Sequence, residues 1–173
     1  MSNFPIRNLT RCALCAALLC LCSWIAIPLP GISITMQTFG ICFTLQLLEG
    51  SRGTLTILAY LLLGCVGLPV FTGFQGGFGV LLGPTGGYLF GFLVVALIFW
   101  VTESRIPRHV SIFLGLLGCY ICGTCWYTIG YLHAGIQGIP AALLTCVVPY
   151  IIPDVVKAVL AFHLYKHLRQ HIQ

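Results

Sequence analysis

Residues 53–102 read GTLTILAYLLLGCVGLPVFTGFQGGFGVLLGPTGGYLFGFLVVALIFWVT. This interval of 50 residues contains no Asp, Glu, Lys or Arg. A helix rises 1.5 Å per residue, so about 20 apolar residues cross a hydrocarbon core of roughly 30 Å. The interval is therefore long enough for two membrane-spanning helices, joined by a stretch rich in glycine and proline.

Charged residues are also absent from residues 12–48 and 109–153, and each interval can hold two more helices. The chain is 59% hydrophobic and 6% charged, a composition typical of integral membrane proteins. We expect an all-α bundle of six transmembrane helices that forms a single domain over residues 1–173. Proline and glycine end helices, and their positions predict helices at 11–28, 34–49, 54–68, 86–102, 109–131 and 151–167.

Basic residues predict the orientation of this bundle. With the N-terminus inside, seven of the eight Lys and Arg residues fall in cytoplasmic loops or tails, as the positive-inside rule requires. We therefore expect cytoplasmic N- and C-termini and a multi-pass protein of a bacterial-type cytoplasmic membrane. Basic residues scattered in this way do not form a nucleic-acid site. The seven are Arg7, Arg11, Arg52, Arg105, Arg108, Lys166 and Arg169.

Cysteine spacings are weak evidence of redox or metal chemistry in such a chain. Ten cysteines include CxxC spacings at Cys12/Cys15 and at Cys119/Cys122/Cys125, but within membrane helices cysteine behaves as a small hydrophobic residue. A membrane thiol oxidoreductase or an intramembrane enzyme stays open as an alternative of a different class. We predict no metal site and no catalytic residue.

The glycine-rich stretch from Phe71 to Gly87 lacks the Lys-Ser/Thr end of a phosphate-binding loop. Its backbone could instead fold back at membrane depth and approach a ligand closely. The same glycines could serve helix packing, because Gly79, Gly83, Gly87 and Gly91 recur every four residues. The two interpretations are compatible: the first part of the loop would face a ligand, and Gly87 and Gly91 would pack.

The eighth basic residue, Lys157, lies in the last apolar segment, three residues after Asp154. Residues three apart share a helix face, and a charge at membrane depth costs about 3 kcal/mol on insertion scales. The pair should therefore face the bundle interior, either as an anchoring ion pair or as part of a polar binding site at the outer end. Neutral donors and acceptors at a similar depth favour the binding site: Ser33, Thr35, Gln37 and Thr38.

Four blocks of this sequence resemble the BioY family, whose members are biotin-binding S components of energy-coupling factor (ECF) transporters. They are TMQT at 35–38, GCVGLPVF at 64–71, GPTGGY at 83–88 and DVVK at 154–157. The resemblance implies biotin uptake, with biotin held near the outer face beneath a glycine-rich lid between the third and fourth helices. It implies these ligand-binding residues: Asp154, Lys157, Gln37, Thr35, Phe71, Gly73, Phe74, Gln75, Gly76, Gly79 and Tyr88.

The resemblance also implies partners. S components dock on a transmembrane coupling subunit through small residues of the first helix, here Ala13 and Ala17. The chain has no nucleotide-binding motif, so ATP would be used only by partner ABC-type ATPases, and no cofactor is expected in this chain. A carrier for another small carboxylated vitamin is the alternative within transport.

Overall fold

Six long helices account for most of the described chain, and their order follows the six predicted from the sequence. The structure is a computed structural model that describes residues 6–28, 32–131 and 138–172. The long helices are α1 (Ile6–Trp24), α2 (Gln37–Leu48), α3 (Gly50–Cys65), α5 (Gly86–Thr102), α6 (Arg108–Cys125) and α8 (Val148–Ile172). The shorter elements are β1 (Ala26–Ile27), β2 (Ile34–Thr35), η1 (Thr72–Phe74), α4 (Phe78–Leu82), the π-helical turn η2 (Trp126–Tyr131) and α7 (Ile139–Cys146).

The predicted helix limits are correct for α5 and less so at the C-terminal end. The break predicted at residues 133–149 contains α7, and α8 begins at Val148 rather than at 151. Pro140 lies in the first turn of α7, where a missing N–H costs no intrahelical bond, so it begins a helix there rather than ending one. Residues 132–137 lie outside the described residues.

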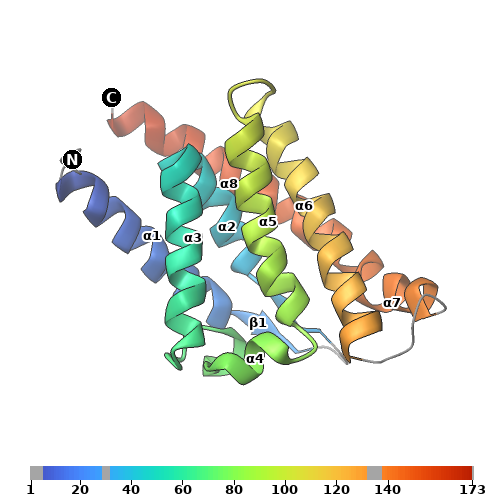
Figure 1. Cartoon of the computed structure of the whole chain (residues 1–173). Helices are drawn as coiled ribbons and strands as arrows, with labels where there is room; N and C mark the ends of the chain where they lie inside the picture. The colour runs from blue at the N-terminus through green and yellow to red at the C-terminus, as the bar shows by residue number, and fades with distance from the viewer. Residues whose placement is uncertain (1–5, 29–31, 132–137, 173) are drawn as a thin grey trace.

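The helices form a bundle with both chain termini at one end (Figure 1). We call this the terminal end, and the opposite end, where α4 and β1 lie, the lid end. Within the described residues, three helical segments are long and apolar enough to cross a membrane: Ile6–Trp24, Arg108–Ile129 and Val148–Gln170. The apolar helices α2 and α5 are shorter.

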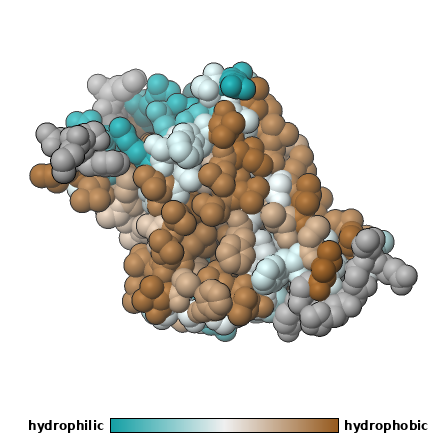
Figure 2. Space-filling model, in the orientation of Figure 1, coloured by the Kyte–Doolittle hydropathy of each residue, from teal (hydrophilic) through white to brown (hydrophobic). Residues whose placement is uncertain are grey.

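Polar contacts join four segments at the terminal end. Arg108 Nη2, at the start of α6, lies 2.6 Å from Glu49 Oε1 in the turn between α2 and α3. Arg108 Nη1 also donates to the Tyr165 hydroxyl of α8 at 2.7 Å. The carboxylate of Glu103 accepts a hydrogen bond from Gly50 N at 2.9 Å. Figure 2 shows hydrophilic side chains gathered at this end and a largely apolar surface below it.

Glycines bring α5 and α6 into close contact. A methyl group at Gly91 would lie 2.6 Å from Cys119 Sγ, and one at Gly87 would lie 2.2 Å from Trp126 Cβ. Real Cβ atoms do not approach so closely, so neither position accepts a side chain without movement of the helices. The prediction that Gly87 and Gly91 pack against another helix is confirmed.

Residues 66–85 connect α3 to α5 and form what we call the lid, which contains η1 and α4. Its first part is fixed by Phe71, whose buried ring lies directly over Gly64 of α3. The Val70 carbonyl accepts hydrogen bonds from Ser23 Oγ of α1 at 2.6 Å and from the Tyr60 hydroxyl of α3 at 3.0 Å. The base of the lid is therefore tied to two helices.

Candidate functional site

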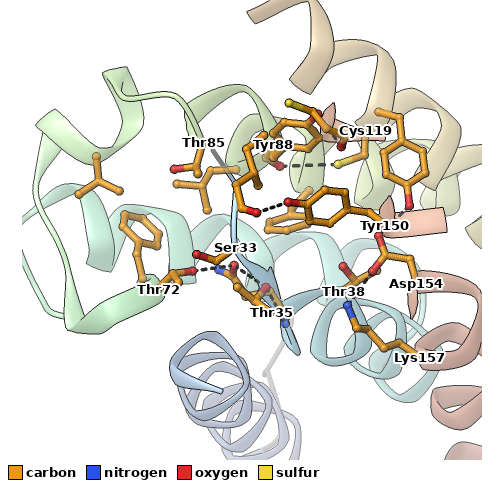
Figure 3. A pocket seen from close by; sticks show the side chains of 18 of the residues that line it. Ser33, Thr35, Thr38, Thr72, Thr85, Tyr88, Cys119, Tyr150, Asp154 and Lys157 are labelled. Atoms are coloured by element: carbon orange, nitrogen blue, oxygen red, sulfur yellow. Dashed lines mark hydrogen bonds and ion pairs between the residues drawn. The ribbon is translucent and has the colours of Figure 1, made fainter. Parts of the chain in front are cut away.

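A cavity of about 280 Å³ lies at the lid end, between the helix ends and the lid (Figure 3). Its volume is at the small end of the roughly 300–1,000 Å³ typical of ligand pockets, which suits a small solute. The lining combines a charged pair, neutral polar groups and aromatic rings. The lining residues are Ile32, Ser33, Thr35, Gln37, Thr38, Phe71, Thr72, Gly73, Gln75, Val80, Thr85, Tyr88, Leu89, Phe92, Leu116, Cys119, Tyr120, Cys146, Tyr150, Asp154 and Lys157.

Asp154 and Lys157 of α8 form a buried ion pair in the wall of this cavity. Lys157 Nζ lies 2.8 Å from Asp154 Oδ1, and the two residues are 7% and 8% exposed. The helix N-terminus does not stabilise Asp154, because α8 begins six residues earlier and has no acidic residue in its first turn. Helix-end stabilisation fades within that turn.

Tyr120 of α6 supplies the second partner of Asp154. Its hydroxyl donates to Asp154 Oδ2 at 2.7 Å, so each carboxylate oxygen has one donor. A carboxylate offers about four acceptor sites and an ammonium group three donors, so both groups keep capacity for a ligand. Sequence reasoning missed Tyr120. The available signal was a hydroxyl in the charge-free interval 109–153, where polar groups at membrane depth need a partner.

Gln37 joins three segments at another part of the cavity. Its Nε2 donates to the Tyr60 hydroxyl of α3 at 2.7 Å. Its Oε1 accepts hydrogen bonds from Thr35 Oγ1 of β2 at 3.2 Å and from Thr72 Oγ1 of the lid at 3.4 Å. In Figure 3, Thr72 and Thr85 lie at the opposite end of the cavity from Asp154 and Lys157.

Aromatic side chains line the space between these two ends. The Tyr88 hydroxyl donates to the Cys146 carbonyl at 3.2 Å, and the Tyr150 hydroxyl donates to the Ile32 carbonyl. Phe71 packs edge-on against Tyr60, with ring centroids 5.7 Å apart. The cavity can therefore hold a solute with an apolar body between a charged group and a neutral polar one.

The whole chain matches a known protein family. The matching family model is described as the BioY family and covers residues 1–173. The chain belongs to the BioY family. Its apolar helices and this membership identify a multi-pass membrane protein.

Named relatives and a solved structure extend the match. The "Probable biotin transporter BioY" of Pyrococcus horikoshii is 32% identical over 94% of this chain and 96% of its own. The "Biotin transporter BioY" of Thermotoga maritima is 35% identical over 90% of this chain and 92% of its own. A crystal structure of the S-component for biotin from an ECF-type ABC transporter has a TM-score of 0.82 and 26% identity, over 98% of this chain and 95% of that one. These relatives are transporters, so the enzymatic alternative is not retained.

Most of the ligand-binding residues that the BioY resemblance implied come together in the cavity. Asp154, Lys157, Gln37, Thr35, Phe71, Gly73, Gln75 and Tyr88 all belong to its lining.

Three of the implied residues do not line the cavity, and all three are in the lid. Phe74 is 63% exposed, and its ring lies 4.6 Å from that of Trp24. Gly76 lies against the Leu68 carbonyl, where a methyl group would approach to 2.1 Å. Gly79 has open space at its Cβ position. The lid thus contributes Phe71, Thr72, Gly73 and Gln75 from its first part, with Val80 of α4 and Thr85, and turns Phe74 away from the cavity.

Proposed function

We propose that this chain is a biotin-binding S component that serves biotin uptake across the cytoplasmic membrane. The proposal is supported by membership of the BioY family and by the printed names of its relatives. The observation that carries it is the buried Asp154–Lys157 pair, with Tyr120, at one end of an otherwise neutral and apolar cavity.

The chemistry of biotin fits this arrangement. Its ureido group has two N–H donors and one carbonyl acceptor, its ring and chain are apolar, and its tail is a carboxylate. Asp154 accepts N–H donors, Lys157 donates to a carbonyl or carboxylate, and the aromatic residues enclose the apolar body. The hydroxyl and amide groups around Gln37 hold the remaining polar end of the ligand.

The proposed orientation has six membrane spans, cytoplasmic termini and the lid on the outer side. It is supported by the position of the basic residues, since both ends of the chain and the segments that carry these residues lie at the terminal end of the bundle. A ligand arriving from outside would then meet the lid first, with the ion pair below it.

Transport would need partner proteins. Ala13 and Ala17 are both exposed on α1, so they are accessible to a transmembrane coupling subunit. The described cavity and the sequence motifs offer nothing for nucleotide binding, and ABC-type ATPases would supply the energy. This part of the proposal is tested by co-purification of the chain with coupling subunits, compared with an Ala13→Leu/Ala17→Leu variant.

A biotin titration of purified protein tests the proposal directly. We expect Asp154→Asn and Lys157→Ala each to weaken binding at least tenfold, about 1.4 kcal/mol, because each removes a charged partner of the ligand. Lys166→Ala is the matched control, since Lys166 is an exposed lysine on the same helix. The biotin affinity of this variant should equal that of the wild type. Near wild-type affinity in both cavity variants would remove the pair from the site.

Unfolding must be separated from lost binding, because breaking a buried pair leaves an unpaired charge and costs about 3–5 kcal/mol. The double variant Asp154→Asn/Lys157→Gln leaves no unpaired charge, so it should melt closer to wild type while still failing to bind. A competition panel of carboxylated vitamins then distinguishes biotin from the alternative substrates. Displacement of bound biotin by another vitamin at equal concentration would contradict the assignment.

A further inference from the structure

The outer face of the lid is apolar, although the lid closes a binding site at the end of the bundle. Residues 66–85 contain no charged side chain. Several large apolar side chains of this segment are exposed, from 46% at Leu68 to 85% at Val66. Exposed apolar surface of this kind marks contact with a membrane or a partner. We call it the lid patch: Val66, Leu68, Phe74, Phe78 and Leu82.

The lid patch continues a surface that already faces lipid. Leu55 and Leu62 of α3 are more than half exposed, as is Val66, the residue that caps its C-terminus, and their spacing places all three on one face of the helix. In a multi-pass membrane protein this face contacts acyl chains. Figure 2 shows apolar side chains over α3 and onward to the end of the bundle where α4 lies.

The length of α3 places the lid patch near the outer boundary of the hydrocarbon. The helix has 16 residues and is therefore about 24 Å long, whereas the hydrocarbon core is roughly 30 Å thick. Arg52 holds the start of α3 at the inner boundary, so the hydrocarbon extends beyond Cys65. Residues that directly follow α3 are still at the depth of acyl chains.

An aromatic pair formed by α1 and the lid also indicates that the lid patch lies near the outer boundary of the hydrocarbon. Trp24, at the end of α1, lies against Phe74 and donates its indole N–H to the Pro69 carbonyl at 2.9 Å. Tryptophan is enriched at the membrane–water interface, where an apolar ring and a hydrogen-bonding group are both satisfied. Phe74 has a positive φ of 58°, and its ring points away from the cavity.

We propose that the outer face of the lid is a lipid-contact surface, with the lid patch resting on phospholipid acyl chains at the outer interface. The membrane would then help to hold the lid over the cavity, because lifting the lid patch into water exposes its apolar side chains. This inference rests on the membrane orientation given under Proposed function. A second copy of the chain or a coupling subunit on the same face is the competing occupant.

Quenching of Trp24 fluorescence by brominated phospholipids in nanodiscs tests the inference. Trp100→Phe/Trp126→Phe leaves Trp24 as the reporter, and Trp24→Phe/Trp126→Phe leaves Trp100, which is 48% exposed on α5, as a lipid-facing reference. We expect the fraction of Trp24 emission that brominated lipid quenches to be at least half of the fraction quenched for Trp100. Quenching of Trp24 should be stronger when the bromine lies near the headgroup than when it lies near the end of the acyl chain. Emission unchanged by brominated lipid overturns the inference.

A second measurement does not depend on tryptophan replacement. A benzophenone amino acid at Phe78 should form phospholipid adducts on illumination, whereas one at Ser104, exposed in the turn after α5, should not. Adducts to a second copy of the chain, or no lipid adduct at Phe78, overturn the inference. Biotin titration of the same nanodiscs separates the two proposals. Biotin binding without lipid contact would reject only the lipid-contact surface. Absence of biotin binding in the unmodified protein would reject the proposed function.

Discussion

Asp154 is positioned from two sides, by Lys157 Nζ at 2.8 Å and by the Tyr120 hydroxyl at 2.7 Å. A hydrogen bond to a charged group contributes about 1.5–3 kcal/mol. We expect Tyr120→Phe to weaken biotin binding roughly tenfold, because the carboxylate would lose the donor that fixes its orientation. Isothermal titration of the purified variant measures this change.

Tyr165→Phe is the control for that substitution. The Tyr165 hydroxyl accepts a hydrogen bond from Arg108 at the terminal end, outside the cavity lining. The Tyr165→Phe substitution should lower the melting temperature by a few degrees and leave the biotin affinity within about twofold of the wild-type value. Equal effects of the two substitutions on affinity would mean that Tyr120 acts through general stability.

Individual residues could be predicted from the sequence where a charge was out of place. Asp154 and Lys157 stood out because charges at membrane depth are costly, and the structure buries both in the cavity wall. The signal at Tyr120 was weaker, a hydroxyl without a charge, since tyrosine is common in membrane helices as an interface residue. Its role depends on how α6 faces α8, which no spacing along the chain encodes.

At the scale of elements, the base of the lid is fixed at the Val70 carbonyl. Ser23 Oγ of α1 lies 2.6 Å from this oxygen. Removing one such hydrogen bond costs about 1 kcal/mol, which corresponds to roughly a fivefold change in rate or affinity. We expect Ser23→Ala to speed biotin dissociation by about that factor, as followed by stopped-flow chase with unlabelled biotin.

Thr10→Ala serves as the control for Ser23→Ala, since the Thr10 hydroxyl donates to the Ile6 carbonyl within α1, near the other end of that helix. Its dissociation rate should match wild type. A Ser23→Ala variant with an unchanged dissociation rate would mean that the hydrogen bond from Ser23 to Val70 does not help to hold the lid over the ligand.

The contact between α5 and α6 permits a matched pair of glycine substitutions. Gly91→Ala forces a methyl group to within 2.6 Å of Cys119 Sγ, and such overpacking costs about 1–3 kcal/mol. Gly79→Ala meets open space in α4 and should be neutral or slightly stabilising, because alanine restricts the unfolded chain. Thermal unfolding in detergent should therefore show a lower melting temperature only for Gly91→Ala, and a similar fall in both would contradict the packing argument.

Helices were predictable where their limits are local and less so where they are not. The interval 86–102 is α5 because charge and turn residues bound it on both sides. The sequence predicts a break over residues 133–149, yet residues 139–146 form α7, and Ala142 and Cys146 of this helix are buried. Burial against other helices, rather than the local sequence, decides that segment.

At the scale of the whole molecule, the sequence predicts the order of the six long helices, and the family match agrees with the substrate class that the resemblance implied. The division of the lid into a cavity side and an outer side was not predictable. It depends on how η1 and α4 fold over the helix ends, since Gly73 faces the cavity while Phe74, the next residue, faces outward. Adjacent residues in a loop thus serve different surfaces.

Orientation in the membrane is the remaining property of the whole molecule, and reporter fusions test it. Seven basic residues lie in the helix ends or in a turn on the side of the chain termini, and the translocation machinery retains such segments in the cytoplasm. Green fluorescent protein fused after Gln173 should therefore fluoresce. Alkaline phosphatase should be active when fused after Thr85, at the end of the lid, and inactive when fused after Arg105, one helix later. The reverse pattern would place the lid and cavity on the cytoplasmic side, where biotin could not enter from outside, so it would contradict uptake as well as orientation.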